Sequence, residues 1–353
     1  MLFRSSVCCG RYQMLIGREK PNNAMSTELL TEETVIPYLI DKKIVNQDEN
    51  PEVEVLTGGV SNVVLAITTD SKKLVLKQAL AELKVAEKWE ADQRRAIVEA
   101  NAISLFHQLS PKQVPKLVFL DPDRFILILE RVPVGSTVWK TDLLSGVINP
   151  DIAAELGQTL ASWHNFGVGD QKARSQFLED TLFEQLRIDP FYRFVAAKNQ
   201  HLQPTISQLI SELEGDQTTI VHGDFSPKNM MVGMDDQVYV LDFEVTHVGN
   251  PVFDVAFLLA HLLCKFYRTD VAIEAELLKS CAHQYVEHYS QLRAIAPSFG
   301  LHTALIALAR VEGKSPVNYL DPQKQALLVA HTKNSLLSGR NVEIEELFSK
   351  EQS

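Results

Sequence analysis

The spacing of apolar residues changes character about one third of the way along the chain. Before residue 131, short apolar runs alternate with turn residues, and this pattern predicts strands at residues 52–57, 62–68, 72–78, 116–120 and 125–130. Helical patterns cover residues 25–49 and 91–109, where apolar residues recur every three or four positions. The first part of the chain is therefore expected to be β-rich with few helices.

After residue 131 the pattern is helical almost throughout. Helices are predicted at residues 151–165, 177–198, 204–213 and 252–267, with others nearer the end, and one short β segment is predicted at 238–242. A β-rich part followed by a helical part predicts an α+β protein of two unequal lobes. The expected divisions are a disordered extension at 1–25, a β-rich lobe at 26–130, a helical lobe at 131–345 and a tail at 346–353.

The composition is that of a globular protein and narrows the choice of partners. The chain has 45% hydrophobic and 22% charged residues, which argues against disorder. Its net charge of −11 gives no broad basic surface, so neither nucleic acid nor an anionic membrane is an expected partner. The four cysteines form no CxxC pair, which favours a reducing cytoplasm. The most apolar window, residues 255–264, is too short to span a bilayer.

The densest group of chemically informative residues lies between 219 and 244. The segment TIVHGDFSPKN places His222, Asp224 and Asn229 after a β-type run, and VYVLDFE places Asp242 after another. The kinase motifs H-R-D-x-x-x-x-N and D-F-G have the same internal spacing, although the arginine of the first and the glycine of the second are replaced here. The joint occurrence of both motifs, in this order, predicts a phosphotransferase.

The chemical requirements of phosphoryl transfer from a nucleotide indicate a role for each of these residues. The reaction needs a carboxylate that accepts the hydroxyl proton and oxygen ligands that hold Mg²⁺ against the phosphates. We therefore predict Asp224 as the catalytic base and Asn229 and Asp242 as metal ligands. His222 belongs to the same catalytic loop, where a bond to backbone is expected rather than proton transfer. Only eleven residues separate Asp242 from Asp254, which leaves no room for a peptide-binding platform and favours a small acceptor.

The β-rich part contains the residues expected to hold the nucleotide. Gly58, Gly59, Ser61 and Asn62 join two predicted strands, and glycines allow backbone N–H groups to approach phosphate closely. A glycine hairpin without a ligand is the alternative interpretation. Lys77 ends the third predicted strand, which is where a kinase lysine contacts the α- and β-phosphates.

Two further nucleotide contacts are expected in this part of the chain. Glu99, in the middle of the second predicted helix, is the expected carboxylate partner of the lysine, with Glu87 and Glu90 as rivals. The backbone around Glu130 and Val132 resembles a hinge that would bond adenine, although this segment is equally consistent with a plain strand end.

Four other polar residues are each open to two interpretations from the sequence. Asp254, at the start of an apolar helix, is expected to cap that helix or to brace the catalytic loop rather than to bind metal. Lys228 fits a solvated loop charge, although it lies near the acceptor side. Arg310 and Lys314 fit either acceptor contacts or a solvated surface.

Four segments resemble the aminoglycoside phosphotransferase/choline kinase family, a branch of the protein-kinase-like fold. They are VHGDFSPKNMMV, YVLDFEVTHVGNPVFDVAFLLA, and LTGGVSNVVLAI with LVLKQAL, and together they span residues 52–263. The resemblance implies ATP, or GTP, with Mg²⁺, and transfer to a hydroxyl group of a small molecule. It maps the family's catalytic aspartate to Asp224, its metal ligands to Asn229 and Asp242, and its lysine to Lys77.

A narrower similarity is to the 5-methylthioribose kinases. Residues 77–99 resemble their nucleotide-lobe segment, and D-F-E resembles their D-x-E metal pair, which makes Glu244 a third candidate ligand. Asn229 and the single arginine Arg310 depart from that pattern. The hypotheses are thus a small-molecule kinase, a methylthioribose kinase-like sugar kinase, or a non-catalytic nucleotide-binding member of the same fold, acting as a monomer or homodimer.

Overall fold

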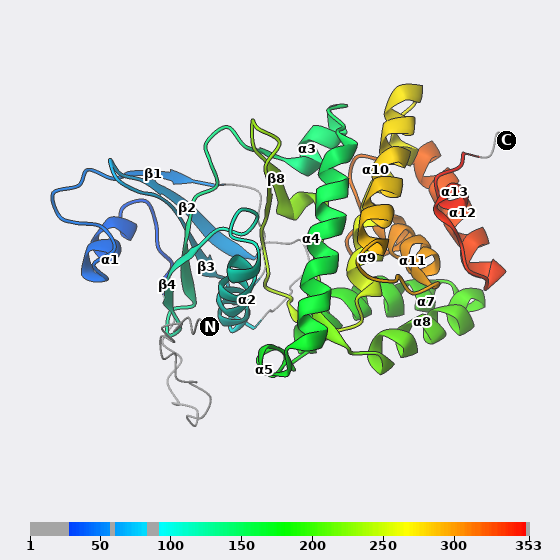
Figure 1. Ribbon diagram of the computed structural model, residues 1–353, viewed down its shortest axis with the longest axis horizontal. Helices are drawn as coiled ribbons and strands as arrows, with labels where there is room; N and C mark the ends of the chain where they lie inside the picture. Colours follow the sequence, from blue (N-terminus) through cyan, green and yellow to red (C-terminus); the bar gives the residue numbers. More distant parts are fainter. Residues whose placement is uncertain (1–27, 57–60, 83–91, 351–353) are drawn as a thin grey trace, which may run out of the picture.

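The smaller lobe is built on an antiparallel five-stranded sheet. The computed structural model describes residues 28–56, 61–82 and 92–350, and the strands are ordered β1-β2-β3-β5-β4. The strands are β1 (Glu52–Val55), β2 (Asn62–Thr68), β3 (Lys73–Ala79), β4 (Leu117–Asp121) and β5 (Ile126–Glu130). Figure 1 shows this sheet at one end of the molecule and the helical lobe at the other.

Alternation along the strands gives the sheet two different faces. Leu74 and Leu76 of β3 belong to a hydrophobic cluster with apolar residues of α1 (Val35–Asp41), which covers one face. Successive strand residues point to opposite sides, so Lys77 lies on the other face, together with α2 (Arg95–Leu109), whose apolar residues join the main core. The lysine predicted to contact phosphate therefore faces the helical lobe.

The larger lobe is mainly helical and also carries two small sheets. Its α-helices are α3 (Trp139–Leu144), α4 (Pro150–Gly169), α5 (Gln171–Arg174), α6 (Thr181–Phe183), α7 (Phe194–Lys198), α8 (Gln203–Gly215), α9 (Val252–Arg268), α10 (Ala272–Ser290), α11 (Phe299–Glu312), α12 (Pro322–Ser338) and α13 (Ile344–Leu347). A π-helix, η1 (Glu184–Arg193), and the 3₁₀ turns η2 (Gln200–Leu202) and η3 (Pro227–Asn229) complete the helical elements. The short strands are β6 (Thr137–Val138), β7 (Thr219–Val221), β8 (Met230–Val232), β9 (Val238–Val240) and β10 (His247–Gly249).

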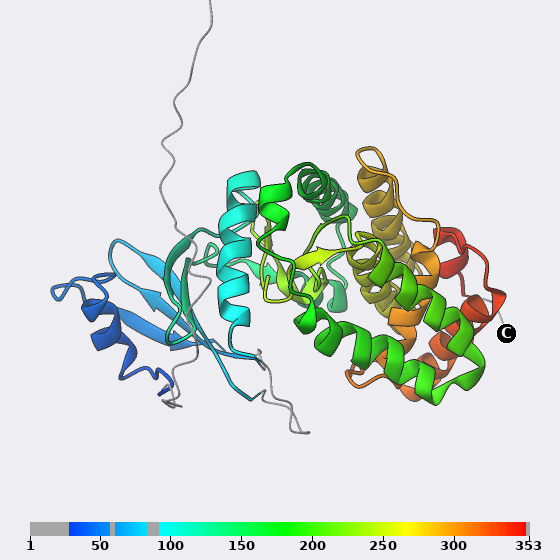
Figure 2. The same cartoon turned by 90° about the horizontal axis from the view of Figure 1, so that it is seen from below.

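The helix α9 is the centre of this lobe. Its residues 252–267 are all buried, and it packs against α10, α11 and α12 (Figures 1 and 2). A helix that is apolar on all sides is stable only inside a core, which explains the apolar window at 255–264. Within the described residues, no helix is long and apolar enough to cross a membrane.

The structure confirms most of the long elements predicted from the sequence, corrects two predicted helices and adds short strands. The helix predicted at 25–49 is wrong in extent, because α1 covers only Val35–Asp41; Lys43 has a φ of 59°, which turns the chain and buries Ile44. The helix predicted at 177–198 is split into α6, η1 and α7, with Pro190 inside the π-helical part. The strand β7 matches the β-type run predicted before His222. The strands β6, β8 and β10 were not predicted, because two or three residues show no alternation.

Candidate active site

The predicted catalytic loop follows β7 and is held by Asp254. The backbone N–H groups of His222 and Gly223 donate to the two carboxylate oxygens of Asp254 at 2.6 and 2.9 Å. His164 lies 3.3 Å from the same carboxylate, which is fully buried in the first turn of α9. Burial would raise the pKa of Asp254, but the bonds from His164 and from the loop outweigh it and hold this pKa below its ordinary value. The loop is thus fixed to the central helix.

Gly223 is required by the shape of this loop. Its φ is +76°, in the left-handed region, and an added Cβ would lie 2.6 Å from the carbonyl oxygen of Val245. No other residue fits here without displacing backbone. This explains why glycine occupies the position that is arginine in the protein-kinase motif.

Asp224 points one carboxylate oxygen at three donors. Its Oδ2 lies 3.0 Å from Nη2 of Arg187, 2.9 Å from Nζ of Lys228 and 2.8 Å from Nδ2 of Asn229. Its Oδ1 is buried and has no hydrogen-bond partner among the described residues. Burial would raise the pKa of Asp224, but the two cations outweigh it and keep this pKa below its ordinary value. The carboxylate is therefore ionised, with one oxygen available as an acceptor.

His222 uses both ring nitrogens inside the loop. Its Nδ1 accepts the backbone N–H of Asp224 at 3.1 Å, and its Nε2 donates to the carbonyl oxygen of Leu241 at 3.1 Å. Burial lowers the pKa of His222, so the ring is neutral. These contacts tie the loop to the segment before Asp242 and match a backbone-bonding role.

Lys77, Glu99 and Asp242 form a group that joins the two lobes. The ammonium of Lys77 lies 2.5 Å from Oε1 of Glu99 and 2.9 Å from Oδ1 of Asp242. Burial would lower the pKa of Lys77, but the carboxylates of Asp242 and Glu99 outweigh it and raise this pKa. Burial would raise the pKa of Asp242, but the ammonium of Lys77 outweighs it and lowers this pKa. Burial also disfavours the charged form of Glu99. Asp242 has a φ of 68°, a conformation that aims its side chain across at the sheet. Glu99 thus has the lysine partner proposed for it, whereas Glu87 and Glu90 lie outside the described residues.

Asn229 and Asp242 each keep one oxygen without a donor among the described residues. The amide Nδ2 of Asn229 donates to the carbonyl and the carboxylate of Asp224, which leaves its Oδ1 as an acceptor. In the described ranges, no group of three His, Cys, Asp or Glu side chains is placed to hold a metal ion. Two oxygen donors are nevertheless typical of Mg²⁺ beside a nucleotide, because this ion keeps waters and phosphate oxygens in its shell. The donor set therefore fits Mg²⁺.

Glu244 is engaged by a buried arginine that sequence reasoning did not single out. Oε2 of Glu244 accepts from Nε of Arg95 at 3.2 Å, and the guanidinium also donates to the carbonyl oxygens of Ser61 at 2.5 Å and Leu80 at 2.8 Å. Burial, reinforced by Asp242, raises the pKa of Glu244. Arg95 thus connects the D-F-E segment to the ends of β2 and β3, and Glu244 has a partner other than a metal.

The remaining predicted nucleotide contacts lie on the small lobe. Gly58 and Gly59 lie outside the described residues. Asn62, at the start of β2, donates to the hydroxyl of Ser61 at 2.9 Å. The backbone N–H of Val132, just after β5, has no partner in the part of the chain that the structure describes, as an adenine-bonding position requires.

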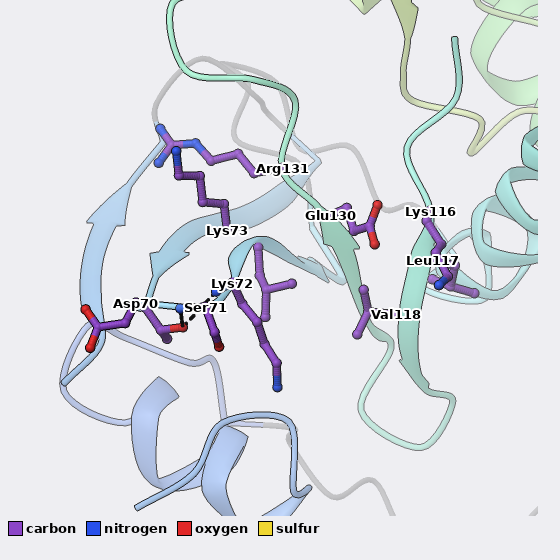
Figure 3. Close-up of a pocket in the computed structure, with 11 residues that line it drawn as sticks. Asp70, Ser71, Lys72, Lys73, Lys116, Leu117, Val118, Glu130 and Arg131 are labelled. Atoms are coloured by element: carbon purple, nitrogen blue, oxygen red, sulfur yellow. Dashed lines mark hydrogen bonds between the residues drawn. The ribbon is translucent and has the colours of Figure 1, made fainter. Parts of the chain in front are cut away.

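Glu130 is arranged differently from Val132. Its N–H donates to the carbonyl of Lys116 at 2.9 Å. Its side chain lines an open hollow of about 620 Å³ on the small lobe, together with Lys73 and Arg131 (Figure 3). None of the predicted catalytic or metal-binding residues lines this hollow, so it is separate from the group around Asp224.

Comparisons with solved structures identify the fold. A choline kinase from Streptococcus pneumoniae superposes with a TM-score of 0.52 and 13% identity, covering 87% of this chain and 99% of that one. An amicoumacin kinase in complex with AMP-PNP and Ca²⁺ superposes with a TM-score of 0.54 and 14% identity, covering 88% and 96%. The fold is therefore the protein-kinase-like α+β fold of two lobes.

A comparison of the sequence with protein-family models identifies the family of this chain. The model of the phosphotransferase enzyme family matches residues 52–295, and the chain belongs to this family. A methylthioribose kinase of Bacillus cereus is 24% identical in an alignment of 263 residues that covers 66% of this chain and 66% of that protein. The chain thus covers just under two thirds of the length of this relative.

Proposed function

We propose that the protein is an ATP-dependent phosphotransferase that moves the γ-phosphoryl group to a hydroxyl of a small molecule. The observation that carries the proposal is the arrangement of Asp224: an ionised, buried carboxylate with one oxygen held by three donors and the other without a partner among the described residues. A carboxylate in this state accepts the proton of an alcohol as the oxygen attacks phosphorus. Family membership and fold point to the same chemistry.

In this proposal the smaller lobe binds the nucleotide, and the larger lobe supplies the metal ligands and the base. Lys77, positioned by Glu99, contacts the α- and β-phosphates, while the backbone at Val132 bonds the base of ATP or GTP. Asn229 and Asp242 hold Mg²⁺, which neutralises charge on the phosphates. The acceptor oxygen gives its proton to Asp224 and forms the new bond to phosphorus. The bond between the β- and γ-phosphates breaks, and ADP leaves with its electron pair.

The test is acceptor-dependent ADP release by the purified protein, followed with a coupled assay over a panel of sugars, amino alcohols and aminoglycosides. Asp224→Ala is expected to lower turnover about a hundredfold or more while Mg²⁺-ATP still binds. Unchanged turnover in Asp224→Ala would show that the proposed mechanism is wrong. ATP binding without turnover on any acceptor would instead favour a non-catalytic nucleotide-binding protein.

Methylthioribose is a second candidate acceptor, because a methylthioribose kinase is among the relatives. The D-F-E segment also matches that hypothesis. Its Glu244, however, is paired with Arg95 here, at 3.2 Å. Including methylthioribose in the panel decides between this sugar and other acceptors.

A further inference from the structure

Three basic side chains gather in the helical lobe. They are Lys140 of α3, Lys265 of α9 and Arg310 of α11, called here the basic cluster. The ammonium groups of Lys140 and Lys265 lie 5.9 and 5.5 Å from the centre of the Tyr319 ring, so the two charges share one aromatic side chain. The guanidinium of Arg310 lies 5.7 Å from the centre of the Phe191 ring.

The basic cluster is next to the catalytic loop. Helix α3, which carries Lys140, packs against η3, the turn that contains Lys228 and Asn229. Helix α11 packs against η1, which carries Arg187. Burial and the charges of Arg310 and Lys228 lower the pKa of Lys140, which also shows that these cations are close enough to repel one another.

No carboxylate neutralises the basic cluster within the described ranges. None of its three side chains has an Asp or Glu oxygen within 4.0 Å there, in contrast to Arg187 and Lys228, which both contact Asp224. The ammonium of Lys265 is almost fully buried and donates only to a carbonyl oxygen, that of His261. An aromatic face stabilises a cation less than a carboxylate at ion-pair distance does, so the rings of Tyr319 and Phe191 do not replace a counter-ion for this cluster.

Two polar atoms of this region also lack partners. Nε of Arg310 and the hydroxyl oxygen of Tyr319 are buried, and neither has a hydrogen-bond partner in the part of the chain described. The other contact of Arg310 is a bond to the hydroxyl of Ser315 at 3.1 Å. Buried donors without partners are rare in native proteins and call for a ligand or water.

We propose that the acceptor carries an anionic group, a carboxylate or a phosphate, which Arg310 and Lys140 bind beside Tyr319 while a hydroxyl of the same molecule faces Asp224. The inference rests on the proposed function. Arginine and lysine are the usual partners of such oxyanions, and arginine supplies paired donors. A cationic acceptor is disfavoured, because it would add positive charge beside Lys140 and Arg310, neither of which has a carboxylate oxygen within 4.0 Å among the described residues.

The test compares three molecules with one carbon skeleton: D-gluconate, D-glucitol and 1-amino-1-deoxy-D-glucitol, which are anionic, neutral and cationic. A second set is glycerol 3-phosphate, glycerate, glycerol and 3-aminopropane-1,2-diol. Binding to the full chain is measured by calorimetry with Mg²⁺-AMP-PNP present, so that the nucleotide phosphates are already in place. At least one anionic member is expected to bind about tenfold or more tightly than its neutral counterpart.

Variants link this preference to the basic cluster. Arg310→Gln and Lys140→Met are each expected to lower affinity for the anion about tenfold and to leave the affinity for Mg²⁺-AMP-PNP unchanged. Lys172→Met, at an exposed lysine of α5, is the matched control and should change neither. The midpoint of thermal unfolding of each variant shows whether it is folded.

The proposal is overturned if neutral or cationic members bind as tightly as the anions, if no anionic member binds, or if both cluster variants bind the anion like the wild type. Asp224→Ala separates this inference from the proposed function. Anion binding that persists in Asp224→Ala while its ADP release is lost supports both the anion site and the phosphotransferase. Anion binding by a wild-type protein that releases no ADP with any acceptor supports the anion site and contradicts the phosphotransferase activity.

Discussion

Asp254 accepts the backbone N–H of His222 at 2.6 Å, although 32 residues separate the two in the chain. The same carboxylate accepts the next N–H, that of Gly223, at 2.9 Å. One buried side chain of α9 thus sets the path of the loop that presents Asp224. The position of the predicted base is determined by the most deeply buried helix of the larger lobe.

Asp254→Ala should therefore damage both stability and turnover. It leaves two buried N–H groups without an acceptor, at a cost of about 3 kcal/mol of the free energy of unfolding. Asp254→Asn keeps one acceptor oxygen and should lose about half as much. Urea unfolding measures the stability, and the coupled ADP assay measures turnover. Wild-type stability in Asp254→Ala would show that the loop has another support.

Gly223→Ala tests the conformation of the same loop. The added methyl would meet the carbonyl oxygen of Val245 at 2.6 Å, and its φ of +76° disfavours alanine, so a loss of about 2–3 kcal/mol is expected with a displaced Asp224. Gly169→Ala, at the end of α4 in open space, is the matched control. It should leave stability unchanged or raise it by up to about 1 kcal/mol. Equal effects of the two substitutions would contradict the assigned role of Gly223.

Arg187→Met should move the acid limb of the pH profile of turnover. Arg187 opposes the effect of burial on the pKa of Asp224, so its removal raises this pKa. The base works ionised and loses activity as pH falls through its pKa. The fall should therefore occur at a higher pH in the variant than in the wild type. Lys228→Met is the comparison: its ammonium is half exposed, so solvent screens it and the shift should be smaller. Identical acid limbs in all three proteins would contradict this role of Arg187.

The sequence predicted the parts of the site that are encoded by local spacing. His222, Asp224 and Asn229 lie within eight residues, and Asp242 follows its own β segment, so motif and strand pattern together predicted their neighbourhood. The pairing of Lys77 with Glu99 followed from the expected strand and helix. How these residues act is a prediction that the experiments above test.

Arg187 and Arg95 could not be found in this way. Arg187 reaches Gly223 across 36 residues from a π-helical segment that contains Pro190, and no sequence pattern marks either feature. Arg95 contacts Glu244 across 149 residues. A contact of this kind depends on how the lobes pack, which one sequence without relatives does not specify. The sequence named Arg310 as a candidate acceptor contact, but its grouping with Lys140 and Lys265 could not be predicted for the same reason: the three residues come from α3, α9 and α11.

The lowered pKa of Lys265 predicts how the free energy of unfolding should depend on pH. Burial, with the charges of Lys140 and Arg310, lowers the pKa of Lys265 to about 7. In the unfolded chain the ammonium of Lys265 stays protonated up to about pH 10, so above pH 7 the unfolded chain binds more protons than the folded protein. The free energy of unfolding therefore rises with pH. From about pH 9 the buried thiol of Cys264, whose pKa burial raises to about 11, acts in the opposite direction.

The expected gain in the free energy of unfolding of the wild type is therefore about 2 kcal/mol between pH 7 and 9. Lys265→Met removes the titrating group and keeps an apolar side chain of similar length, so it should be more stable than the wild type at pH 7 and should lack this rise. Lys172→Met, at an exposed position, should retain it. Urea unfolding at several pH values makes the comparison. A rise of the same size in Lys265→Met would show that another group carries the pH dependence, and that the ammonium of Lys265 is compensated in the folded protein.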